Sequence, residues 1–178
     1  MLCSLLLYAL TQAAGVQVPL SPEDIQKAYD ANEAALLERL TKRASLKPEE
    51  IKTTVEALGH IRSKKAVPLL LEMIEFSTVI TGDPMQFLEG GSKLSSYEYR
   101  YPAYRALIEI GNQPLASVVK EIEAGKADST RETLLASLGF WLHRDGFVQR
   151  ARELAGIKGS PEQARWERIA TFVAPKKP

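Results

Sequence analysis

Residues 57–63 read Ala-Leu-Gly-His-Ile-Arg-Ser, and residues 106–112 read Ala-Leu-Ile-Glu-Ile-Gly-Asn. Both segments end a helical pattern in Ala-Leu-x-x-Ile, pass through a polar turn, and lead into an apolar stripe. The two stripes consist of Val67, Leu70, Leu71 and Ile74, and of Leu115, Val118, Val119 and Ile122. Their i, i+3, i+4, i+7 spacing gives each second helix one apolar face, which must be buried against a neighbouring repeat. This internal repeat predicts a helical solenoid.

A third, weaker copy follows, in which residues 137–141 occupy the positions of residues 106–110. Its second helix would bury Phe147, Ala151 and Leu154. A weaker match to the repeat pattern is typical of a terminal repeat. We expect a last helix from Pro161 to close that end with Trp166, Ile169, Ala170 and Val173, and we expect Trp141 and Trp166 to lie in the core. The predicted fold is all-α: a short right-handed solenoid of about three helix pairs, with additional N-terminal and C-terminal helices.

Helix starts carry clear signals along the chain. Ser21 followed by Pro22 predicts a helix to about Arg43, and Pro48 with two following acids opens the next helix. We expect Ser63 and Asn112 to cap the second helix of their pairs, and Ser129-x-x-Glu132 and Ser160-x-x-Gln163 match the capping box. The inward faces would consist of Ile25, Ala28, Tyr29, Leu36 and Leu40 in the first helix, and of Ile51, Val55, Leu58 and Ile61 in the second.

The repeated segments resemble a known family. Ala-Leu-x-x-Ile-Gly-Asn at residues 106–112, followed by an apolar helix, and Ala-Val-Pro-Leu-Leu at residues 66–70 are similar to the HEAT-like repeat, including the variety found in bilin lyase subunits. The resemblance implies an armadillo-like αα superhelix. It is poorly specific for function, because HEAT-like proteins include scaffolds, transport factors, enzyme subunits and regulators. The first copy departs from the pattern at its turn, where Arg62 takes the place of the glycine.

Composition narrows the classes of function. The chain has 178 residues, 45% of them hydrophobic, and a net charge of +1, which gives no general attraction to nucleic acid or membrane. Its single cysteine, Cys3, excludes a disulfide framework or a cysteine-based zinc site. With His60 and His143 as the two histidines, we predict no metal and no cofactor.

The N-terminal residues 1–14 form an apolar run with small residues at its end. This pattern favours a cleaved secretory leader, although no Lys or Arg precedes Lys27; a packed N-terminal helix, or a start within a longer leader, is the alternative. The run is too short to span a bilayer. We therefore predict one domain over residues 15–178, secreted or periplasmic if the leader is cleaved and otherwise cytoplasmic.

An insertion separates the first two copies. Ala57 and Ala106 are 49 residues apart, whereas the second and third copies are about 31 apart. The extra residues, about 76–99, contain Gly, Pro and β-branched residues that argue against a continuous helix. Insertions of this kind often lie on the binding face of a solenoid. We predict an apolar partner-binding surface there, formed by Val79, Ile80, Met85, Phe87 and Leu88; in the alternative, these residues fold over the core.

The densest aromatic and basic run, residues 97–105, follows the insertion. Tyrosine and arginine are enriched in the energetic centres of protein interfaces. The run therefore predicts further partner contacts, from Tyr97, Tyr99, Arg100, Tyr104 and Arg105. Packing of Tyr101 and Tyr104 between helices is the alternative, and single-stranded nucleic acid is disfavoured by the near-neutral charge.

Candidate chemistry is confined to a few polar positions. His60 and Glu109 are equivalent residues of successive repeats, so stacking should bring them together, more often as a surface ion pair than as an acid–base pair. The sequence therefore favours a non-catalytic scaffold that binds another protein. The alternatives are an enzyme or enzyme subunit of the lyase type that the repeats resemble, and a structural member of an extracytoplasmic complex. A homodimer through an exposed solenoid end is a further expectation.

Overall fold

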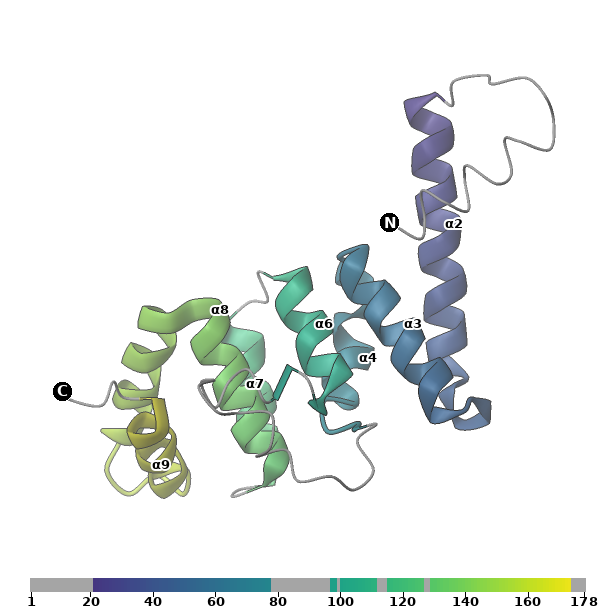
Figure 1. Ribbon diagram of the computed structural model, residues 1–178. Helices are drawn as coiled ribbons and strands as arrows, with labels where there is room; N and C mark the ends of the chain where they lie inside the picture. Colours follow the sequence, from purple (N-terminus) through teal and green to yellow (C-terminus); the bar gives the residue numbers. More distant parts are fainter. Residues whose placement is uncertain (1–20, 78–96, 99, 112–114, 127–128, 174–178) are drawn as a thin grey trace, which may run out of the picture. The chain divides into compact units, whose positions relative to one another are not determined.

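The computed structural model describes residues 21–77, 97–98, 100–111, 115–126 and 129–173. Within these ranges the regular elements are helices and no strand occurs, which confirms the all-α class. The α-helices are α2 (Pro22–Thr41), α3 (Pro48–His60), α4 (Val67–Glu72), α6 (Pro102–Ile110), α7 (Leu115–Ala124), α8 (Thr130–Ala155) and α9 (Gln163–Val173) (Figure 1). Two short 3-10 helices, η1 (Arg43–Ser45) and η2 (Lys64–Ala66), precede α3 and α4.

The chain divides into two compact units, Met1–Ala35 and Leu36–Pro178. The described part of the first unit is the N-terminal part of α2, and within the described residues the buried hydrophobic core belongs to the second unit. The predicted leader and most of the predicted insertion lie outside the described residues. Among the helices that the structure describes, none has the length and apolar character needed to cross a bilayer.

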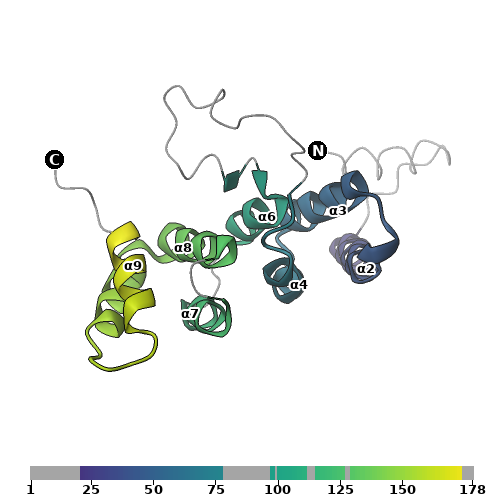
Figure 2. The same ribbon diagram turned by 90° about the horizontal axis from the view of Figure 1, so that it is seen from below.

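In the second unit, helices distant in sequence pack in two rows. Helix α3 packs on α6, α6 packs on α8, and α8 packs on α9. Figure 2 shows α3, α6 and α8 side by side in one row, with α4 and α7 in a second row. Helix α4 contacts α6, and α7 contacts α8. The fully buried members of both predicted stripes line this core: Leu70, Ile74, Val118 and Ile122.

Close contact between α3 and α6 depends on a glycine. A Cβ atom added at Gly59 would lie 2.9 Å from both the Cα and the Cβ atoms of Ala106. Any side chain at residue 59 would therefore push the two helices apart. Two small residues, Gly59 on α3 and Ala106 on α6, therefore set this spacing.

Local signals placed several helix starts correctly. The hydroxyl of Ser63 accepts a hydrogen bond from the backbone N–H of Ala66 at 3.2 Å, and that of Ser129 accepts one from Glu132 at 3.1 Å. The predicted cap at Asn112 lies outside the described residues. Helix α9 begins at Gln163 rather than at Pro161, after a turn in which Ser160 accepts from the N–H of Glu162.

The turns of the first two copies share a left-handed residue. Gly111 has φ 67°, and Arg62, its counterpart in the first copy, has φ 54°. Both turns therefore have a positive φ at this position, although the first copy carries arginine in place of glycine. An L-residue pays for this conformation in strain, because its Cβ approaches the following carbonyl oxygen.

The third copy is a helix pair joined at a sharp break. Helix α8 is continuous except at His143, whose φ −141° and ψ 40° are not helical. Phe147 and Ala151 are fully buried after the break, as predicted. A Cβ at Gly139 would lie 2.5 Å from the Phe147 ring, so this glycine provides the space into which the second segment packs.

Two predictions about buried faces were wrong. Ile25 and Tyr29 of α2 are 40% and 47% exposed, whereas Leu40 of the same predicted face is buried. The periodicity of α2 is helical throughout, but the core contacts lie at its C-terminal end. Trp141 is 47% exposed rather than buried, while Trp166 is buried as predicted.

Candidate protein-binding surface

The residues predicted to bind a partner fall into two groups. Val79, Ile80, Met85, Phe87, Leu88 and Tyr99 lie outside the described residues. Tyr97, Arg100, Tyr104 and Arg105 are described. These four lie on α6 or just before it, at the centre of the row formed by α3, α6 and α8.

Three tyrosines cluster at the start of α6. The Tyr97 ring centroid lies 6.3 Å from that of Tyr101 and 6.0 Å from that of Tyr104, within the range of favourable aromatic pairs. Tyr101 and Tyr104 are buried, whereas Tyr97 is half-buried. Burial, with a smaller contribution from Tyr101, raises the pKa of the Tyr97 phenol. The Tyr97 side chain therefore lies between the core and the surface, and its hydroxyl is neutral.

Arg100 extends this cluster outward. Its guanidinium carbon lies 5.5 Å from the centroid of the Tyr101 ring, and the residue is exposed. This is a cation–π contact, which orders the long arginine side chain while its donors still face solvent. Tyr97 and Arg100 together present an aromatic edge and an oriented cation.

Tyr104 is a core residue, which corrects its prediction as a partner contact. Its side chain is fully buried, and its hydroxyl shares a hydrogen bond of 2.8 Å with that of Ser137 on α8. Burial is the main cause that raises its pKa far above the usual value. The packing alternative thus describes both Tyr101 and Tyr104, because the helical period turns residues 101 and 104 toward α8 and the core.

The expected meeting of His60 and Glu109 is confirmed. The Nδ1 atom of His60 lies 2.9 Å from Oε2 of Glu109, and Arg105 Nε lies 2.9 Å from the other carboxylate oxygen. Glu109 thus bridges α3 and α6 while Arg105 pairs with it within α6. The His60 side chain is largely exposed, so this is a surface network and not an enclosed acid–base site.

A second aromatic and basic surface lies at the break in α8, and sequence reasoning missed it. Phe140 is the counterpart of His60 and Glu109, and Arg144 stacks over its ring at 5.8 Å. The exposed Trp141 lies next to it in sequence. The repeat alignment could have located this surface, because it places Phe140 on the same surface of its helix as the polar pair.

A buried ion cluster holds α7, α8 and α9 together, and the sequence carried no motif for it. Arg165 on α9 pairs with Glu132 of α8 at 2.9 Å, and both side chains are 7% exposed. The same guanidinium donates to the carbonyl oxygens of Ile122, Glu123 and Gly125 at the C-terminal end of α7. Arg168 also reaches Glu132, at 3.2 Å. These contacts hold α7, α8 and α9 together and do not involve Tyr97.

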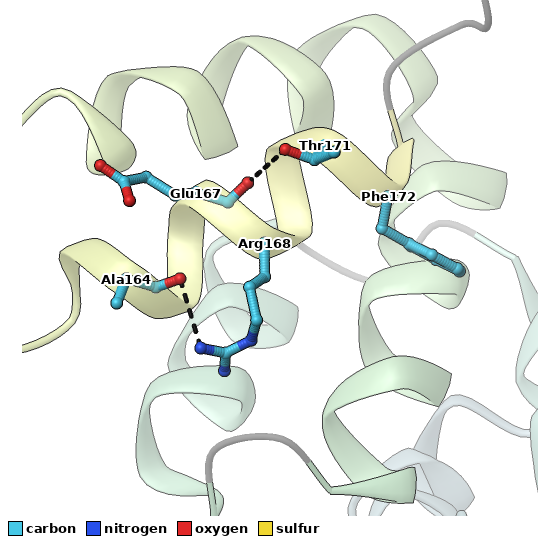
Figure 3. A pocket seen from close by; sticks show the side chains of 5 residues that line it. All are labelled: Ala164, Glu167, Arg168, Thr171 and Phe172. Atoms are coloured by element: carbon cyan, nitrogen blue, oxygen red, sulfur yellow. Dashed lines mark hydrogen bonds between the residues drawn. The ribbon is translucent and has the colours of Figure 1, made fainter.

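The outer side of α9 carries a shallow hollow (Figure 3). It is lined by Ala164, Glu167, Arg168, Thr171 and Phe172. Arg168 donates to the Ala164 carbonyl oxygen at 3.3 Å, and Thr171 donates to that of Glu167 at 2.8 Å. No cluster of three or more His, Cys, Asp or Glu residues suited to a metal ion occurs among the described residues.

Comparison with known proteins adds no identification. No family model, curated protein or solved structure matches this chain. The resemblance to HEAT-like repeats therefore remains a prediction that rests on the residues quoted above.

Proposed function

We propose that this protein is a non-catalytic protein-binding module built as a HEAT-like right-handed solenoid. The packing of α3 on α6 and of α6 on α8, with α4 and α7 in a second row, supports this architecture. So does the meeting of His60 with Glu109, because equivalent residues become neighbours when repeats stack.

The observation that carries the binding proposal is the ordered Tyr97–Arg100 surface. A half-buried tyrosine and an arginine held over a second tyrosine ring have little side-chain entropy left to lose on binding. Residues of these two types dominate interface energetics. Arg105 and the insertion residues Val79, Ile80, Met85, Phe87 and Leu88, with Tyr99, would extend the same surface.

The test replaces residues 77–96 with a short Gly-Ser linker and, in a separate chain, changes Tyr97 and Arg100 to alanine. Partners would be captured from the native host with the intact protein and with both variants, then identified by mass spectrometry. One protein captured by the intact chain and lost in both variants is the expected result. Arg150→Ala is the matched control, because that arginine is exposed and its ion pair lies within one helix turn. A partner retained by both variants would contradict the proposed surface.

The Glu109 network supports a second candidate, an enzyme or enzyme subunit of the lyase type. Its carboxylate orients the His60 imidazole, which is the arrangement that a proton donor or acceptor needs. His60→Gln should then abolish turnover of a substrate while leaving protein partners bound. Unchanged turnover together with loss of protein partners would favour the binding module.

The place of action is part of the proposal. If residues 1–14 are a cleaved leader, the binding module acts outside the cytoplasm, where it would also suit a structural role in a larger complex. Intact-mass measurement of protein from the native host tests this, because a retained Met1 excludes export by that route.

A further inference from the structure

Two helices of the second unit have their C-terminal ends bound by an arginine from a helix further along the chain. At the end of α4, Arg131 donates to the Leu71 carbonyl oxygen at 2.7 Å. At the end of α7, Arg165 donates to the carbonyl oxygens of Ile122 and Gly125 at 3.0 and 2.8 Å. Arginine suits this place because its guanidinium is a cation with several donors, and the last carbonyl groups of a helix lack backbone partners.

Helix α8 ends with the same backbone geometry as α7. In each helix the last residue is an alanine and the next is a glycine, Gly125 after α7 and Gly156 after α8. The Gly125 N–H donates to the carbonyl oxygens of residues 121 and 122 at 3.1 and 3.2 Å. The Gly156 N–H donates to those of residues 152 and 153 at 3.0 and 3.1 Å. The two glycines are 31 residues apart, which is the spacing of the second and third copies.

The carbonyl groups that Arg165 binds therefore have counterparts at the end of α8. Arg165 binds those of residues 122, 123 and 125. The counterparts, 31 positions later, are Glu153, Leu154 and Gly156. In the part of the chain that the structure describes, no side chain donates to these three carbonyl oxygens. Gly156 is exposed, so the end of α8 is accessible from outside.

Side chains around this end can support a bound arginine. Ile157 follows Gly156 directly, and its side chain is 53% exposed, so it offers an apolar contact for the aliphatic part of an arginine. The arginines at the other two helix ends also pair with a carboxylate, Glu121 in one case and Glu132 in the other. Glu153 supplies a carboxylate in the last turn of α8, and its side chain is 49% exposed.

Positive charges near the end of α8 do not exclude a further cation. Arg152 and Lys158 lie within a few residues of Gly156. Lys126 lies equally close to the end of α7, and Arg165 binds there nonetheless. Hydrogen bonds to the carbonyl groups and the negative end of the helix dipole therefore outweigh one nearby cation.

We propose that the C-terminal end of α8 binds the guanidinium group of an arginine from a partner protein, at the three carbonyl oxygens defined above. Arg131 and Arg165 both lie in the first turn of their helices. The partner's arginine is therefore expected near the start of a helix. This site includes no residue of the Tyr97–Arg100 surface and does not depend on the function proposed for it.

The experiment titrates the isotopically labelled full chain with Nα-acetyl-arginine amide and follows backbone amide shifts by NMR. The amides of Gly156 and Ile157 should shift in a saturable manner, with a Kd on the order of 10 mM because the side chain is tested without its helix. Nα-acetyl-citrulline amide, which is neutral and has nearly the same shape, is the control and should cause at most small shifts. The Gly125 amide should not shift, since Arg165 already occupies the end of α7.

Two variants distinguish a carbonyl site from a surface ion pair. Glu153→Gln removes the exposed carboxylate and should weaken binding by about threefold while Gly156 still responds. Arg165→Met vacates the end of α7, so Gly125 should then respond to the arginine probe as well. If Arg165→Met does not fold, the wild-type and Glu153→Gln titrations still decide the question.

Three results would overturn the proposal. A Gly156 amide that does not respond, or that responds equally to citrulline, would show that the end of α8 does not bind a guanidinium. Loss of the response in Glu153→Gln would show that the probe forms an ion pair with the side chain and does not bind the carbonyl groups.

Discussion

The left-handed turn residues Arg62 and Gly111 differ in how easily they adopt a positive φ. Arg62→Gly should raise the free energy of unfolding by about 1 kcal/mol, because glycine removes the Cβ strain. Gly111→Ala should lower it by about 1–3 kcal/mol, since φ 67° with ψ 177° is a region reserved for glycine. Urea denaturation of both variants measures these changes. Equal destabilisation by both would contradict the strain at Arg62.

Glycine at residue 59 is retained for packing and not for backbone freedom. Alanine improves helix propensity by about 1 kcal/mol, yet at residue 59 its Cβ would collide with Ala106. Gly59→Ala should therefore destabilise the fold by about 1–3 kcal/mol. Gly146→Ala is the control, because a Cβ there meets Leu115 at an ordinary 3.6 Å, and it should be neutral or stabilising. In thermal unfolding, Gly59→Ala should lower the Tm, whereas Gly146→Ala should leave it unchanged or raise it.

The buried Tyr104 phenol makes stability depend on alkaline pH. Burial raises its pKa in the folded chain, whereas in the unfolded chain the pKa is about 10. Above pH 10 the unfolded state loses this proton first, so the contribution of Tyr104 to stability falls as pH rises. Tyr104→Phe should cost about 1 kcal/mol at pH 7 through the lost Ser137 hydrogen bond.

The measurement compares denaturation at pH 8 and pH 11. The difference in unfolding free energy between the wild type and Tyr104→Phe should shrink at the higher pH. Tyr29→Phe, which removes an exposed hydroxyl, should leave stability at pH 7 unchanged. A difference that stays constant between the two pH values would show that Tyr104 does not cause the dependence.

At the scale of elements, arginines tie helix ends together across the second unit. Arg165 caps the end of α7 and pairs with Glu132 of α8, while Arg131 of α8 donates to the Leu71 carbonyl oxygen at 2.7 Å, near the end of α4. Cations at helix C-termini satisfy carbonyl groups that lack partners and complement the helix dipole. Arg165 thereby links α9 to α7, and Arg131 links α8 to α4, two pairs of helices that are not consecutive in the chain.

Removing Arg165 should therefore be costly. Arg165→Met leaves Glu132 with Arg168 alone and leaves three carbonyl oxygens without this donor, so we expect a loss of about 3 kcal/mol. Arg150→Met breaks an exposed pair within one helix and should cost less than about 0.5 kcal/mol. Chemical denaturation distinguishes the two. Similar small losses would mean that the buried cluster contributes little.

At the scale of the whole molecule, stability should reside in the second unit. Among the residues that the structure describes, Leu40 is the first of the buried core, so a fragment beginning at Leu36 retains every described core residue. We expect the fragment to unfold cooperatively, with a cost of about 1 kcal/mol from the truncated helix end and a Tm about 2–4 °C lower. Calorimetry of the fragment and the full chain tests this. Loss of cooperative unfolding would show that the first 35 residues are needed for folding.

The candidate surface could be predicted only in part. The repeat alignment placed His60 beside Glu109, because equivalent residues of stacked repeats become neighbours. It could not distinguish the exposed Arg100 from the buried Tyr104, since both belong to one aromatic and basic run. Which of them faces water depends on where α8 packs against α6, and that contact joins segments more than 30 residues apart.

By itself, the sequence determined the helical class, several helix starts and the apolar stripes of the first two copies, because propensity, capping and periodicity act within a few residues. Tertiary structure alone decided that Ile25, Tyr29 and Trp141 are exposed, and that Arg165 is buried against Glu132. Amphipathic spacing states which face of a helix is apolar. It does not state how far along that face a neighbouring helix extends, and that length of contact determines which apolar side chains leave water.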